Sequence, residues 1–133
     1  MFVIRGRSTE GKLVQRDENF TGQAWGDHLL STPNGVGMST VYFAPGARTY
    51  WHRHEEGQIL SIVSGEGIVA TRDGEVALVR AGDIVWTEPG VEHWHGACFD
   101  TFFVHTSASI GATDWRGEVA PADYTRAQQR DQA

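Results

Sequence analysis

The stretch GARTYWHRHEEGQ, residues 46–58, decides how this chain folds and what it binds. It contains His52 and His54, which are separated by one residue. On a β-strand, the side chains of residues i and i+2 project from the same face. The two imidazoles therefore lie about one ligand spacing apart. Gln58 follows after a short turn, and His93 comes much later in the chain. Three imidazoles and one amide oxygen can meet around one divalent metal ion.

The composition around this stretch indicates a single all-β domain. The chain has 133 residues, enough for one hydrophobic core, and its one cysteine, Cys98, cannot form an internal disulfide. Its 16 glycines predict many tight turns between short strands. Many short strands at regular spacing are typical of a sandwich or a barrel.

Alternating apolar and polar residues predict the positions of the strands. The hairpin signal Asp73-Gly74 is the strongest, and a short helix is expected after Pro121, at residues 122–129. The strands are expected at residues 2–5, 12–16, 20–30 (bent or bulged), 37–44, 49–54, 58–63, 66–71, 75–80, 84–87, 92–97 and 100–107.

Two sets of residues resemble the two motifs of the cupin family. Gln58 stands where the first motif usually has glutamate, Glu88 where the second usually has proline, and Ala97 where it usually has asparagine. The resemblance covers roughly residues 36–110 and implies a jelly-roll β-barrel with a metal inside one mouth. The matching residues are Gly46, His52, His54, Gln58 and Gly65 in the first motif, and Gly82, Pro89, Gly90 and His93 in the second.

A narrower resemblance is to the subgroup that contains the bacterial cupin hydroxynitrile lyases. It implies manganese or another divalent ion held by three histidines and one glutamine, and two further histidines, His95 and His105, near the open metal positions. The ligands it implies are His52, His54, Gln58 and His93. The stretches that carry it are residues 45–49, Gln58, residues 82–86, residues 93–97 and Asp114-Trp115.

The residue types themselves agree with this chemistry. Imidazole ligands suit Mn, Fe, Co, Ni, Cu or Zn, and a neutral Gln58 leaves the ion its full charge. His95 lies two residues after His93 and so faces the same side, and His105 shares its parity with Phe103. A free imidazole beside a cation protonates less readily and can act as a general base. We therefore expect His95 or His105 to move a proton.

Several functions remain open at this point. The first is a lyase acting on a small carbonyl or hydroxy compound, with the metal as Lewis acid. The others are a dioxygenase that uses O2, an enolising isomerase, cyclase or dehydratase, and a small-molecule-binding module without catalysis. The simpler interpretations are a hydrogen-bonded strand pair for His52 and His54, and satisfied core histidines for His95 and His105.

The charge distribution limits the partners. The formal net charge is -6 and Lys12 is the one lysine, so we expect neither nucleic acid nor an anionic membrane surface as a partner. No long apolar run marks a signal peptide or a transmembrane helix, and a single cysteine fits the cytoplasm. One domain is expected over residues 1–133, with edge strands at 1–16 that favour a homodimer or homotetramer, a barrel core at 36–110 and a C-terminal helix and tail at 121–133.

Overall fold

The computed structural model describes residues 1, 3–8 and 10–130 of the chain. These residues form strands that curl into an all-β barrel, and one helix near the C-terminus, as expected from the sequence. The elements are β1 (Val14–Gln15), β2 (Phe20–Thr21), β3 (Ala24–Ser31), β4 (Val36–Phe43), β5 (Arg48–Thr49), β6 (Trp51–His54), β7 (Gln58–Thr71), β8 (Val76–Arg80), β9 (Ile84–Thr87), β10 (His93–Ala97), β11 (Phe103–Ile110), β12 (Thr113–Gly117) and α1 (Pro121–Arg130).

The longest strand, β7, turns a corner and belongs to both halves of the barrel. Its first half pairs with β11 and β9, and its second half pairs with β10 and β8. Gly65 lies at the corner with a φ of 78°. A Cβ at this position would overlap the carbonyl oxygen of Phe102, so both the backbone conformation and the neighbouring chain require glycine.

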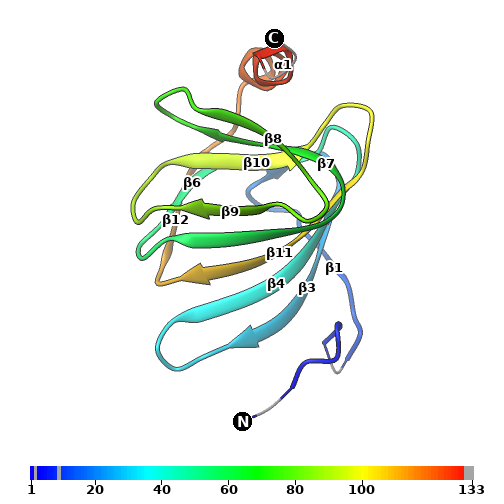
Figure 1. The fold of residues 1–133 in the computed structure, drawn as a ribbon, viewed down its shortest axis with the longest axis vertical. Helices are drawn as coiled ribbons and strands as arrows, with labels where there is room; N and C mark the ends of the chain where they lie inside the picture. The colour runs from blue at the N-terminus through cyan, green and yellow to red at the C-terminus, as the bar shows by residue number, and fades with distance from the viewer. Residues whose placement is uncertain (2, 9, 131–133) are drawn as a thin grey trace.

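The two halves face each other across the barrel interior. One contains β1, β3, β4, β11, β9 and the first half of β7, and the other contains the second half of β7 with β8, β10, β6, β5, β2 and β12. In Figure 1 the helix α1 lies at one end of the molecule, beyond β8, and the N-terminal segment lies at the other end, beside β3. None of the helical structure among the described residues is long and apolar enough to cross a membrane.

Two hydrophobic clusters hold these layers together. The first lies between the two halves of the barrel and consists of Ala24, Val41, Phe43, Ala47, Leu60, Ile62, Val69, Val79, Ala97 and Phe103. The second packs α1 against the outer side of β7 and β10 and consists of Trp51, Ile68, Ala70, Trp94, Cys98, Val119, Tyr124 and Ala127. Cys98 is therefore a buried core residue.

Most predicted strands are confirmed within a few residues, and the hairpin about Asp73-Gly74 and the helix after Pro121 are confirmed as well. Three predictions of continuity were wrong. Residues 20–30 form two strands, β2 and β3, because they pair in different halves of the barrel. The predicted strand 49–54 is interrupted at Tyr50, whose amide bonds to the carbonyl of Asn19. The predicted break at Ser64-Gly65 is only the corner of β7.

Three predictions at strand ends were also wrong. The predicted strand 100–107 begins at Phe103, because Asp100 lies in a turn and the Thr101 hydroxyl donates to the carbonyl of Glu66. The last strand, β12, was not predicted. At the N-terminus, residues 3–5 form no strand and residues 12–16 contribute only β1, which takes the free edge of β3. Phe2 and residues 131–133 lie outside the described residues.

The N-terminal segment is attached to the barrel by one buried carboxylate. Asp27 on β3 has no exposed surface, and its Oδ2 lies 2.6 Å from Arg7 Nε and 3.1 Å from the amide nitrogen of Ser8. Hydrogen bonds from Ser8 and then Arg7 lower the pKa of Asp27 to about 2. These bonds connect a segment without secondary structure to the sheet.

We predict that docking of this segment depends on pH with a definite sign. Because the pKa of Asp27 is lower in the folded protein, its contribution is present above the ordinary pKa near 3.8 and is lost as the pH falls through about 2. Hydrogen exchange of the Ser8 amide measures this, and Asp27→Asn should accelerate that exchange about tenfold at neutral pH. Unchanged exchange in Asp27→Asn would show that other contacts dock the segment.

Candidate metal centre

Five buried imidazoles converge inside the barrel. His52 and His54 come from β6, His93 and His95 from β10, and His105 from β11. The antiparallel register places His93 directly opposite His52, and their ring centroids lie 4.3 Å apart. Strand alternation explains the arrangement, because residues two apart on β6 and on β10 face the same interior.

Three of these histidines form a cluster with metal-binding geometry. The ring nitrogens of His52, His93 and His95 lie within 4.8 Å of one another, and all three residues are buried. The ring of His54 adjoins this cluster, with its centroid 4.9 Å from that of His52 and 5.5 Å from that of His93. A cluster of this kind is consistent with a divalent metal site.

The outer ring nitrogens are held by hydrogen bonds. Nδ1 of His52 lies 2.8 Å from the carbonyl oxygen of Tyr50, and Nδ1 of His93 lies 3.0 Å from that of Val91. A carbonyl only accepts, so Nδ1 carries the proton in both rings and Nε2 is left with a free lone pair. Nδ1 of His54 bonds to the Thr113 hydroxyl at 3.0 Å. Such contacts orient the rings of metal-binding histidines.

The side chain of Gln58 indicates that a cation fits between these groups. Its Nε2 donates to the Ser109 hydroxyl at 3.0 Å, which turns Oε1 towards Nε2 of His93 at 3.2 Å. Because His93 carries its proton on Nδ1, two acceptor atoms face each other here. The buried Nε2 of His54 has no hydrogen-bond partner among the described residues. Facing acceptors and an unsatisfied nitrogen together fit a shared divalent ion.

His95, a member of this cluster, also forms a hydrogen-bonded pair with His105. His95 Nδ1 lies 3.0 Å from His105 Nε2, and the ring of Phe43 packs against both imidazoles. His95 Nε2 and His105 Nδ1 are buried and lack partners among the residues that the structure describes. A proton can therefore pass along this pair, and one end of it stays free for another group.

Burial keeps all five imidazoles neutral at neutral pH. Loss of solvent is the largest cause of the lowered pKa in each case. The next cause is the repulsion that a protonated His93 would exert on charged His52 or His54, and that a protonated His105 would exert on charged His95. It lowers the pKa of His54 to about 4 and that of His105 to about 3. The pKa of His93 is lowered too, and those of His52 and His95 lie well below the ordinary value. Neutral imidazoles are the form that binds metals or accepts protons.

Four of the imidazoles, those of His52, His54, His95 and His105, line a cavity of about 260 Å³ at one mouth of the barrel. All six predicted site residues are buried, and two residues of β12 to which the sequence assigned no role lie beside them. Thr113 orients His54, and the indole of Trp115 lies 4.7 Å from the His52 ring between centroids. The alternation of Thr113 and Trp115 was the available signal. The lining residues are Arg16, Phe20, Ser39, Val41, Thr49, His52, His54, Gln58, His95, His105, Ser107, Ser109, Thr113 and Trp115.

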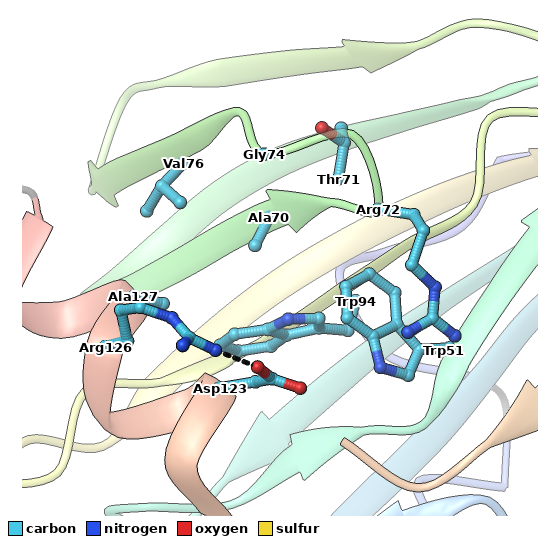
Figure 2. A pocket seen from close by; sticks show the side chains of 10 residues that line it. All are labelled: Trp51, Ala70, Thr71, Arg72, Gly74, Val76, Trp94, Asp123, Arg126 and Ala127. Carbon is cyan, nitrogen blue, oxygen red and sulfur yellow. Dashed lines mark hydrogen bonds and ion pairs between the residues drawn. The ribbon is translucent and has the colours of Figure 1, made fainter. Parts of the chain in front are cut away.

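A second hollow of about 190 Å³ lies on the opposite side of β10, under α1. Figure 2 shows the indole of Trp94 between the sheet and the ion pair of Arg126 with Asp123, and Arg72 stacked on Trp51. Trp94 has about 1% of its surface exposed, whereas His93 and His95 on either side of it face the barrel interior. Figure 2 therefore shows helix packing, and the chemistry lies on the other face of the sheet.

An all-β barrel with an interior three-histidine cluster defines the class of protein, and comparison with known proteins identifies the family. Residues 39–104 match the cupin domain model. The chain is 38% identical over 113 residues to a protein of Granulicella tundricola named (R)-mandelonitrile lyase, with 80% of this chain and 86% of that protein covered. The chain belongs to the cupin family.

Two further similarities bear on the fold and the chemistry. The crystal structure of a cupin-like protein from Thermotoga maritima has a TM-score of 0.80 and 32% identity, with 96% of each chain covered. A protein of Ralstonia sp. named gentisate 1,2-dioxygenase is 40% identical over 52 residues, which is 39% of this chain and 15% of that protein. The Thermotoga similarity extends over nearly the whole fold, and the Ralstonia similarity covers only part of it.

Proposed function

We propose that this chain is a divalent-metal-dependent lyase that cleaves a carbon–carbon bond in a small hydroxy compound, as in the cleavage of a cyanohydrin. The observation that carries the proposal is the neutral His95–His105 pair, which shares His95 with the metal-binding cluster and lines the cavity at the barrel mouth. The similarity to a protein named (R)-mandelonitrile lyase supports the choice of reaction.

The proposed metal ligands are His52, His54, Gln58 and His93. The three imidazoles are each fixed at Nδ1 by a group outside the cluster, and Gln58 is fixed through Ser109. Manganese is our first choice, and Fe, Ni, Co, Zn or Cu suits the same donors. When bound, the ion supplies Lewis acidity towards a developing oxyanion or leaving anion.

His95 carries the proton, and His105 is hydrogen-bonded to Nδ1 of His95. In the tautomer where His95 Nδ1 donates to His105 Nε2, the free His95 Nε2 accepts the proton of the substrate hydroxyl. The bond to the nitrile carbon breaks, its electron pair leaves with cyanide, and the hydroxyl oxygen becomes an aldehyde carbonyl. The imidazolium then returns the proton to cyanide, and hydrogen cyanide is released with the aldehyde.

We predict a specific order of effects on metal content, measured by elemental analysis and by titration of chelator-treated protein. His54→Ala should lose stoichiometric metal, and Thr113→Val should bind it about 10- to 100-fold more weakly because the His54 ring loses its anchor. His95→Ala should retain the metal. If His54→Ala keeps stoichiometric metal while His95→Ala loses it, the ligands are His52, His93 and His95 instead.

We predict that cyanohydrin cleavage does not need oxygen and does need the histidine pair. Turnover of mandelonitrile should be equal with and without O2, and His95→Ala should lower kcat about 10²- to 10⁴-fold. His28→Ala, which changes a histidine outside this cavity, is the matched control. If His95→Ala and His105→Ala both keep full turnover, the assignment of the proton carrier is wrong.

A dioxygenase is the second candidate, supported by the partial similarity to the Ralstonia protein. The same three histidines suit Fe(II), and an octahedral ion held by them without Gln58 would have three open positions, enough for a bidentate substrate and O2. Turnover of the true substrate that stops under anaerobic conditions selects this candidate. An enolising isomerase, cyclase or dehydratase uses the same proton carrier, and a binding module would show metal without turnover.

We also propose a homodimer, formed through the outer face of β7 and β9. Ile59 opposes Trp86 and Ser61 opposes Ile84 across these strands, and the three apolar side chains are 40–65% exposed. With Val63 they present roughly 400 Å² of apolar surface, about half of what each partner of a stable complex buries. The face is uncharged in a chain of net charge -6, so a second copy meets it without repulsion. A cytoplasmic location is proposed because a chain with one cysteine can form no internal disulfide.

Sedimentation of the wild-type protein and of Ile84→Glu tests the dimer. A charge at residue 84 in each copy should convert a wild-type dimer to a monomer, because it buries two like charges at one interface. Phe99→Glu is a matched control at another exposed apolar position. A wild-type monomer, or a dimer that persists in Ile84→Glu, contradicts this interface.

A further inference from the structure

The side chain of Arg16 enters the barrel mouth from outside the cupin motifs. Arg16 follows β1, and its amide bonds to the carbonyl of Ala24 at 2.8 Å. Its guanidinium then lies over Gly26, where a Cβ would overlap Nη2 and Nε. The absence of a side chain at residue 26 therefore creates the space that the guanidinium occupies.

That space belongs to the reaction cavity. Gly26 is paired with Val41, and Val41 is paired with His105 on the next strand. Side chains of directly paired residues project from the same face of a sheet, and Arg16, Val41 and His105 all line the cavity. Neighbouring strands lie about 5 Å apart, so Gly26 and His105 are separated by about 10 Å.

Arg16 is the one lining residue of this cavity that is charged at neutral pH. The lining contains no aspartate or glutamate, and its histidines are neutral because of burial. No hydrogen bond or ion pair of the Arg16 guanidinium is found among the described residues, whereas Arg7, Arg53, Arg72, Arg116 and Arg126 each form an ion pair. Arg16 is only partly exposed. The N–H donors of its planar guanidinium are thus available to a ligand in a cavity that is otherwise uncharged.

We propose that Arg16 binds a carboxylate of the substrate, which makes the substrate class of this site small hydroxy or oxo compounds that carry an anionic group. The reacting hydroxyl or carbonyl lies towards His95 and His105, and the carboxylate lies towards Arg16. A guanidinium binds a carboxylate through two parallel hydrogen bonds, and an uncharged cavity strengthens this contact. This inference rests on the proposed function for the position of the reacting group.

Binding of matched probes tests the proposal without turnover. The probes are 4-formylbenzoate with 4-formylbenzamide, and mandelate with mandelamide, each pair differing by one negative charge. Affinity is measured by calorimetry on chelator-treated and on metal-loaded protein. At least one carboxylate should bind about tenfold or more tightly than its amide, and added salt should reduce the difference.

Variants assign the preference to Arg16. Arg16→Gln should reduce the carboxylate-to-amide ratio to about 1 and leave amide affinity and metal content unchanged. Arg16→Lys should restore part of the ratio, since an ammonium is a point charge without the fork. Gly26→Ala should lower the ratio by displacing the guanidinium, the flexible end of a side chain, without unfolding the protein. Arg80→Gln removes the same charge from an exposed position and should change nothing.

Two results overturn the proposal, and both are distinct from failure of the proposed function. It is wrong if neither carboxylate is preferred in the wild-type protein, or if Arg16→Gln keeps the preference. If the chain binds no metal and cleaves no cyanohydrin, but chelator-treated protein keeps an Arg16-dependent preference, only the lyase assignment fails. If mandelonitrile is cleaved and Arg16→Gln leaves probe binding unaltered, only the role of Arg16 fails.

Discussion

The cross-strand pair of His52 and His93 is the interaction on which the site depends. One register position of β6 and β10 brings two imidazoles to a centroid distance of 4.3 Å in a buried interior. Burial disfavours the protonated form of each ring and lowers both pKa values, so both imidazoles are neutral. Two neutral rings, each with its proton turned outward, leave lone pairs that face inward. A cation between them would stabilise these lone pairs. The Oε1 atom of Gln58 and the unsatisfied Nε2 atom of His54 face the same space.

Part of the site could be predicted from sequence alone, because strand alternation puts His52 and His54 on one face of a strand and His93 and His95 on one face of another. The meeting of these two faces was expected from the resemblance to the cupins, and the register of β6 and β10 confirms it. The all-β barrel and the C-terminal helix were predictable for a similar reason, since turn residues and apolar periods are local signals. The hydrogen bond between His95 and His105 was not predictable, because it depends on the approach of β10 and β11 in space.

Residues from segments without a motif complete the site. Thr113 and Trp115 come from β12, and Arg16 comes from the short segment after β1. The positions of Thr113 and Trp115 follow from the pairing of β12 with β6, and that of Arg16 follows from one small residue, Gly26, on a neighbouring strand. Local patterns cannot show such relations.

The corner in β7 has a consequence for how the barrel loses its structure. This strand pairs with β11, β9, β10 and β8, and it carries Gln58 at one end while its other end reaches the helix-covered face. Neither half of the barrel can separate without breaking the backbone ladder of the other. Local opening is therefore confined to the ends of the chain and the short edge strands, and the histidine cluster should exchange its amides only when the whole molecule unfolds.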